Sequence, residues 1–165
     1  MTRFAELKDL LIGNKLTIAV AESLTCGLVQ AKLGEISGAS GFLEGGITTY
    51  NLEQKVKFLC VDEFHAQSVN CVSKKVAIEM ATHVSRIFGS NIGIGTTGYA
   101  EPYPEEEVTI PYCFYALYLH LKPSESPTVI ANKIQIGGLD RNLTRHYFAD
   151  TVLSRLILEL RERVR

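Results

Sequence analysis

The stretch Leu16–Gly27 (LTIAVAESLTCG) decides the fold class. Its first half, Leu16 to Ala21, is a short apolar run of the kind that forms a buried strand. Its second half is polar and leads into a helical pattern that extends from about 25 to 34. A buried strand that turns into a helix is the repeating unit of open α/β sheets, where ligands collect at the carboxyl ends of the strands.

The rest of the chain continues this alternation and then places two strands next to each other. Apolar spacing and N-cap residues predict helices at 2–13, 51–59, 73–87 and 140–163, the last three capped by Asn51, Ser73 and Asp140. β-branched and aromatic residues predict strands at 46–50, 92–95, 112–121 and 128–136. Prolines and consecutive glutamates predict a loop at 101–111. The pattern therefore predicts an α/β fold, a single three-layer α/β/α domain with a mixed sheet that spans residues 1–165.

Composition excludes several classes of function. The chain has 165 residues and a formal net charge of -1, so it has no global positive field that would attract nucleic acid or an anionic membrane. The amino terminus has no signal-peptide core, and no apolar run reaches the roughly 18 residues of a membrane span. We expect a cytoplasmic protein with free thiols and no metal site, because its cysteines and histidines lack metal-ligand spacing. These residues are Cys26, Cys60, Cys71, Cys113, His65, His83, His120 and His146.

Two further segments carry the residue types of covalent acyl chemistry. Ser40 lies in the turn Gly38-Ala39-Ser40, and Tyr50 and Lys55 lie in the segment 50–55. A serine hydroxyl attacks a carbonyl only when a base accepts its proton, and a lysine with a lowered pKa can do this while a tyrosine relays the proton. The alternative is that the three side chains are an ordinary turn serine, a packing tyrosine and a solvated lysine.

Other polar residues are candidates for holding an anionic substrate. Glu22, Ser23, Thr25 and Gly27 follow the first strand and open a helix, where backbone amides bind anions. Thr97 and Gly98 follow a second strand, and Arg141 and Arg145 share one helix face, from which arginine pairs grip phosphate or carboxylate. The alternatives are a helix cap, a strand-ending turn and a salt-bridged helix surface. Cys26, at a helix start, is a second candidate nucleophile.

Taken together, these segments resemble the CinA C-terminal domain family, whose enzymatic members are nicotinamide-nucleotide amidohydrolases. The resemblance covers about residues 5 to 160 and follows the family motifs in order. The motifs A-E-S-C-T-G-G, G-S-S, G-x-V-T-Y-S-N-x-x-K, g-A-V-S, T-G-I-A-G-P and G-D-R-x-x-V-R correspond to Ala21–Gly27, Gly38–Ser40, Gly46–Lys55, Asn70–Ser73, Thr97–Pro102 and Leu139–Arg145.

This resemblance implies a reaction and a set of site residues. The reaction is hydrolysis of nicotinamide mononucleotide to nicotinic acid mononucleotide and ammonia, and it needs no metal and no organic cofactor. Ser40, Tyr50 and Lys55 would form the catalytic group, and Thr97, Arg141 and Arg145 would belong to the substrate pocket. The binding partner would then be a small nucleotide substrate. We also expect the chain to form a homo-oligomer.

The chain departs from the family pattern on the substrate side. Leu24 replaces a cysteine, Cys26 replaces a glycine, and Glu101 replaces the glycine before Pro102. Residues 103–107 (YPEEE) replace a glycine-rich stretch, and new carboxylates near a phosphate site repel the phosphate. Two alternatives therefore remain open: a non-catalytic relative that acts as a binding or interaction module, and the same chemistry on an amide without a phosphate.

Overall fold

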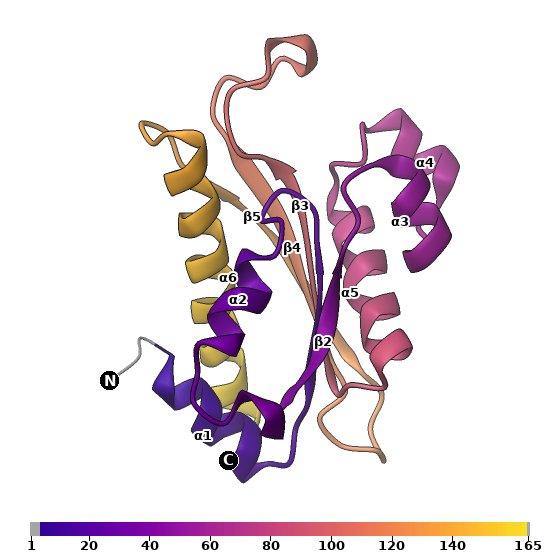
Figure 1. The fold of residues 1–165 in the computed structure, drawn as a ribbon. Coiled ribbons are helices and arrows are strands. Elements are labelled where there is room, and N and C mark those ends of the chain that lie inside the picture. Colours follow the sequence, from indigo (N-terminus) through magenta and orange to yellow (C-terminus); the bar gives the residue numbers. More distant parts are fainter. Residues whose placement is uncertain (1–3, 165) are drawn as a thin grey trace.

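The computed structural model describes residues 4–164 and shows a five-stranded mixed sheet between two layers of helices (Figure 1). The strand order is β2-β1-β3-β4-β5. The first three of these strands run parallel, whereas β4 is antiparallel to both β3 and β5. The strands are β1 Ile18–Glu22, β2 Leu43–Thr48, β3 Ile92–Tyr99, β4 Tyr112–Leu119 and β5 Thr128–Gln135. The predicted α/β fold with a mixed sheet is confirmed.

Helices cover both faces of the sheet. On one face, α5 packs against β1, β3 and β4, and α3 and α4 lie beyond its amino-terminal end (Figure 1). On the other face lie α1, α2 and α6 (Figure 1). The helices are α1 Ala5–Gly13, α2 Leu28–Gly34, α3 Leu52–Leu59, α4 Glu63–Ser68, α5 Lys74–Phe88 and α6 Arg141–Arg163. Over residues 4–164, none of these helices is both long and apolar enough to span a membrane.

The centre of the sheet is fully buried. All five residues of β1 are buried, as expected for an apolar strand covered by helices on both faces. Two glycines of β3 allow α5 to approach the sheet closely. A Cβ atom at Gly93 would lie 1.9 Å from the carbonyl oxygen of Ala81, and one at Gly95 would lie 2.3 Å from that of Ala77. Any larger residue at these positions would push α5 away from the strand.

The predicted N-caps are confirmed. The side chains of Asn51, Ser73 and Asp140 each accept a hydrogen bond from the backbone N–H group three residues later. These three caps fix where α3, α5 and α6 begin, and all three helices start at the predicted place because the signal is local.

Several predicted boundaries differ from the structure, and the differences have physical causes. β2 covers 43–48 rather than 46–50, because its register is set by pairing with β1. β3 extends to Tyr99 rather than ending at Gly95, because its second half pairs with β4. α2 begins at Leu28 rather than near Thr25, and the short helix α4 was not predicted. The helix predicted at 2–13 begins at Ala5 within the described residues, and its positions 2 and 3 lie outside them.

Candidate active site

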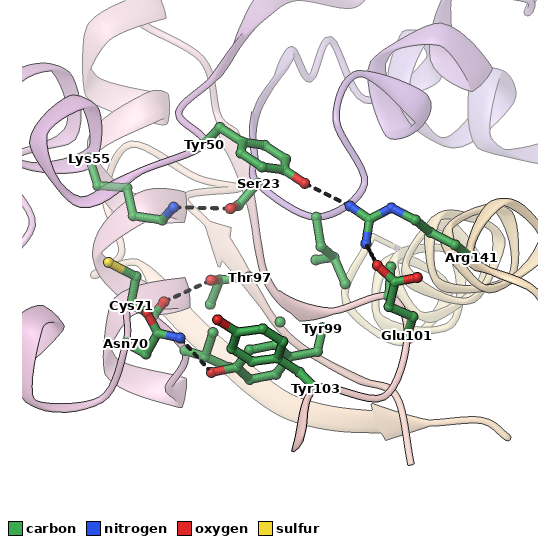
Figure 2. Close-up of a pocket in the computed structure, with 14 residues that line it drawn as sticks. Ser23, Tyr50, Lys55, Asn70, Cys71, Thr97, Tyr99, Glu101, Tyr103 and Arg141 are labelled. Atoms are coloured by element: carbon green, nitrogen blue, oxygen red, sulfur yellow. Dashed lines mark hydrogen bonds and ion pairs between the residues drawn. The ribbon is translucent and has the colours of Figure 1, made fainter. Parts of the chain in front are cut away.

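A pocket of about 320 Å³ opens where the carboxyl ends of β1 and β3 meet the segments that surround α3 and the start of α6. This is the edge at which open α/β sheets bind their ligands. Figure 2 shows the side chains that converge on it. The lining residues are Ser23, Leu24, Tyr50, Lys55, Asn70, Cys71, Val72, Thr97, Gly98, Tyr99, Ala100, Glu101, Tyr103 and Arg141.

The innermost contact of the pocket joins Lys55 to Ser23. The Lys55 Nζ atom donates a hydrogen bond to Ser23 Oγ over 3.0 Å and a second one to the carbonyl oxygen of Thr49 over 2.8 Å. Ser23 follows β1 directly, and Lys55 reaches it from the first turns of α3 (Figure 2). Both side chains are buried, Lys55 at 1% exposure and Ser23 at 7%.

Burial changes the acid–base behaviour of Lys55. Removal from water disfavours the charged ammonium and lowers the pKa of Lys55 from its ordinary value of 10.5 to about 8. At pH 7 about one molecule in ten then carries a neutral amine, which can accept a proton from the Ser23 hydroxyl. A serine within hydrogen-bond distance of such an amine is the arrangement that activates a nucleophile.

Another segment of the pocket wall, Asn70 and Cys71, is held in an unusual backbone conformation. Asn70 and Cys71 are both left-handed, with φ values of 47° and 60°, which is uncommon for residues other than glycine. Contacts from β3 hold the segment in place: Thr97 Oγ1 donates to the carbonyl oxygen of Cys71 over 2.7 Å, and Asn70 Nδ2 donates to the Tyr99 hydroxyl over 3.0 Å. Burial raises the pKa of the Cys71 thiol, so this thiol is less prone to form a thiolate.

The mouth of the pocket carries the guanidinium group of Arg141. Its Nη1 atom lies 2.6 Å from Glu101 Oε1, and its Nη2 atom donates to the Tyr50 hydroxyl over 2.8 Å. Tyr50 points away from Lys55 and toward Arg141 (Figure 2). The tyrosine hydroxyl is therefore part of the arginine's hydrogen-bond network rather than a link between Ser23 and Lys55.

Six of the residues predicted from the sequence line this pocket together. They come from four separate segments of the chain, which the sheet and α6 bring to one edge. They are Ser23, Tyr50, Lys55, Thr97, Gly98 and Arg141.

Ser40, which was predicted to form a catalytic group with Tyr50 and Lys55, does not line this pocket. It lies in the short 3₁₀ helix Ala39–Gly41, which precedes β2, whereas Lys55 follows that strand. Since β1 and β2 are parallel, Ser40 is at their amino end and the pocket is at their carboxyl end. A strand of this length separates them by about 15–20 Å. The serine that the structure places against Lys55 is Ser23.

Glu22, which was predicted to bind substrate, organises the loop instead. It is buried, and its carboxylate accepts hydrogen bonds from three backbone N–H groups at the start of α2, over 2.9 to 3.1 Å. Gly27 supplies one of those N–H groups and has a φ of 91°, which suits glycine. The amides that could have bound an anion are thus bound by the chain's own carboxylate.

Thr25 and Arg145, also predicted to contact substrate, hold the same loop from outside the pocket. Thr25 Oγ1 is buried and lies 2.8 Å from Thr96 Oγ1. Arg145 donates to the carbonyl oxygens of Leu24 and Thr25, each over 3.0 Å. Their interactions fix the position of Ser23 within its loop. Cys26, the second candidate nucleophile, is exposed and is not among the residues that line the pocket.

Reasoning from the sequence did not assign site roles to Asn70, Cys71, Tyr99 and Tyr103. Asn70 and Cys71 had a signal, because they fall in a segment that follows the family pattern. Tyr103 had none, because the sequence does not show where an aromatic residue in an acidic loop lies until the loop between β3 and β4 has folded. Among the described residues 4–164, no cluster of three or more histidine, cysteine, aspartate or glutamate side chains is suited to holding a metal ion.

Comparison with known proteins gives one consistent result. The CinA C-terminal domain matches residues 2–160. A CinA-like protein of Kosmotoga olearia is 37% identical over 158 residues, which cover 92% of this chain and 36% of that protein. A competence-damage inducible protein of Lysinibacillus sphaericus is 47% identical over 94 residues, or 57% of this chain and 22% of that protein. The chain thus spans only about a quarter to a third of the length of these curated relatives.

Solved structures show the same fold. The competence damage-inducible protein A of Klebsiella pneumoniae has a TM-score of 0.87 at 22% identity and covers 96% of this chain and 95% of that one. A CinA superfamily protein of Escherichia coli has a TM-score of 0.80 at 25% identity and covers 93% of this chain and 86% of that one.

Proposed function

The chain belongs to the CinA C-terminal domain family, and from this premise we propose that it is an amidohydrolase acting on the carboxamide of a nicotinamide nucleotide. The observation that carries the proposal is the 3.0 Å hydrogen bond between Lys55 Nζ and Ser23 Oγ in the pocket. A buried lysine with a lowered pKa beside a serine hydroxyl supplies a base and a nucleophile without a metal. We assign the nucleophile to Ser23 rather than to Ser40.

The reaction divides into two steps. In the first, neutral Lys55 accepts the Ser23 proton while Ser23 Oγ attacks the carboxamide carbon, and the Lys55 ammonium then protonates the departing nitrogen, so ammonia leaves and an ester to Ser23 remains. In the second, Lys55 takes a proton from water, whose oxygen attacks the ester carbon. The carboxylic acid leaves and Ser23 regains its proton. No oxidant, reductant or metal is required.

The other pocket residues would position the substrate. Thr97 and Gly98 lie beside the Ser23–Lys55 pair, and Arg141 stands at the mouth. The volume of about 320 Å³ is at the lower end of the range for small-molecule sites. Nicotinamide mononucleotide is the substrate that the resemblance implies, and nicotinamide riboside offers the same carboxamide without the phosphate.

One observation favours a second candidate, a non-catalytic binding module. Arg141, the cation at the mouth, is already paired with Glu101, so the charge that would hold a nucleotide phosphate is neutralised within the chain. The buried Ser23–Lys55 contact argues against this candidate, because an uncompensated buried lysine destabilises a fold and serves no purpose in a passive pocket.

Release of ammonia distinguishes the two candidates. The full chain would be incubated with nicotinamide mononucleotide and with nicotinamide riboside, and both ammonia and the carboxylic acid product would be quantified. The amidohydrolase proposal expects equal molar amounts of the two products from at least one of these amides. Binding of an amide with no product over many hours would instead support the binding module.

A further inference from the structure

The arginine at the mouth of the pocket has its charge balanced by the chain itself. Glu101 Oε1 lies 2.6 Å from Arg141 Nη1, and the Tyr50 hydroxyl accepts a hydrogen bond from Nη2 (Figure 2). Glu101 and Arg141 both line the pocket, so the pair forms part of the surface that a ligand meets. An anionic group that approaches Arg141 must displace this carboxylate or lie next to it.

The wall beside this pair is rich in π electrons. The rings of Tyr99 and Tyr103 stack with centroids 5.6 Å apart and an interplanar angle of 20°, and both residues line the pocket (Figure 2). The Tyr99 hydroxyl is bound by Asn70, whereas Tyr103 is 40% exposed and leaves ring surface open. Aromatic faces attract cations, and flat cationic rings in particular.

Negative charge extends along the same loop. Residues 105–107 are all glutamates and are exposed. Burial and, to a smaller extent, the negative charge of Glu106 raise the pKa of the Tyr99 hydroxyl. The loop side of the pocket therefore combines tyrosine faces with carboxylates, an environment that favours a cation and disfavours an added anion.

We propose that Glu101 is a specificity residue that makes this pocket prefer a cationic pyridinium amide without a phosphate, of the nicotinamide nucleoside class, over the same amide carrying a phosphate. The inference rests on the proposed amidohydrolase function and names its substrate class. Both ligands carry the positive pyridinium ring that the tyrosines and Glu101 attract. They differ in the phosphate. Glu101 repels this phosphate, and Glu101 is already paired with Arg141, the side chain that would otherwise bind it.

The test compares kcat/KM for nicotinamide riboside and nicotinamide mononucleotide in the wild-type chain and in Glu101→Gln, which keeps the shape of the side chain and removes its charge. The wild-type chain should prefer the riboside. In Glu101→Gln the ratio of the two kcat/KM values should shift toward the mononucleotide by about tenfold or more, because a like charge beside the phosphate is gone.

A matched control separates the local contact from the general charge of the loop. Glu105→Gln removes one charge from the same loop, but Glu105 is exposed and is not among the residues that line the pocket. Its substrate ratio should stay within about twofold of the wild-type value, since Glu105 does not line the pocket and water screens its charge over the intervening distance. An equal shift in both variants would overturn the assignment to Glu101. Equal effects of Glu101→Gln on both substrates, or a wild-type preference for the mononucleotide, would overturn the proposal itself.

Calorimetry of riboside and mononucleotide binding to the Ser23→Ala variant separates this selectivity proposal from the amidohydrolase proposal. Suppose that the wild-type chain releases no ammonia, that Ser23→Ala binds the riboside more tightly than the mononucleotide, and that adding Glu101→Gln to this variant removes the preference. The selectivity proposal then stands and the amidohydrolase proposal fails. If neither ligand binds, both are overturned.

Discussion

Two serines of this chain sit at opposite ends of the same pair of parallel strands, and their surroundings differ completely. Ser23 follows β1, is 7% exposed and accepts a hydrogen bond from a buried lysine. Ser40 precedes β2 and is exposed in a turn that lies against α1, where Gly38 and Gly41 face Lys8 and Ile12. Both serines lie in polar segments that match family motifs. Only their place along the strands separates them.

The end of the strand at which a serine lies therefore decides its surroundings, more than the motif to which it belongs. At their carboxyl ends β1 and β2 lead into α2 and α3, and β3 leads into the loop before β4. The crevice at this edge of the sheet is shared by side chains from several segments. At the amino end, α1 packs over the turn, and no cationic side chain is buried there among the described residues. A serine nucleophile is activated by a base with a lowered pKa, and within residues 4–164 a buried lysine amine stands at the carboxyl end of the strands.

The largest expected effect comes from removing the hydroxyl group of each serine in turn. Ser23→Ala should lower kcat for ammonia release by about a thousandfold or more, because no other hydroxyl lies within hydrogen-bond distance of Lys55 in the described chain. Ser40→Ala should retain wild-type kcat and KM. Both proteins should melt near the wild-type temperature. The opposite pattern, with Ser40→Ala inactive, would restore the catalytic group predicted from the sequence.

The second effect concerns the base. Lys55→Met should lower kcat/KM by about a hundredfold to ten-thousandfold, since methionine fills much of the same space and cannot accept a proton. Lys57→Met is the matched control, because Lys57 lies on the same helix and is exposed. Steady-state kinetics on the two variants should show loss in the first and little change in the second. Similar losses in both would indicate that α3 as a whole, and not the buried amine, is what activity requires.

A third effect follows from the lowered pKa of Lys55. The amine acts as a base only when it is neutral, so kcat/KM should rise with pH and reach a plateau above the pKa of about 8. Between pH 6 and pH 8 the rise should be about fiftyfold, as the neutral fraction grows from about one in a hundred to one half. The residual activity of Lys55→Met should lack this rise. A flat wild-type profile over that interval would show that deprotonation of Lys55 does not control the reaction.

The smallest effect separates structure from substrate binding in the loop after β1. Glu22→Gln should lower the free energy of unfolding by about 1–3 kcal/mol, because the amide NH₂ replaces one of the oxygens that accept buried backbone N–H groups. Urea unfolding would measure it, with the exposed Glu35→Gln as a control that should unfold like the wild type. Unchanged stability together with a raised KM would instead mean that Glu22 contacts the substrate.

The parts of the fold that were predicted correctly depend on local signals. The caps at Asn51, Ser73 and Asp140 each satisfy an N–H group only three residues away, so their residue types are enough to reveal them. The buried strand β1 is equally plain, because apolar residues cover its whole length. The polar segments at its carboxyl end, and those that lead to Lys55 and Arg141, were recognised as site segments because their residue types and motifs are also local.

The roles that could not be read from the sequence depend on contacts that form only in the folded chain. Glu22 is an acidic residue at the end of a strand, as many ligand-binding residues are. Its partners are backbone amides that only the folded turn brings to it. Arg145 lies one turn after Arg141 on the same helix, and yet it binds the backbone of the β1 loop while Arg141 faces the pocket. Helical spacing assigns the two arginines to one side of α6 without saying what each of them meets.

The sequence by itself determined the family, the α/β class, the helix caps and the segments from which the pocket is built, because strand burial, capping and motif order are written in neighbouring residues. Only the tertiary structure decided which serine meets Lys55, which arginine faces the pocket and that Glu101 pairs with it. These choices depend on strand register and on which end of a parallel strand a loop occupies, and they join residues between 32 and 121 positions apart. A pKa of about 8 for Lys55 likewise arises only when the fold removes its amine from water.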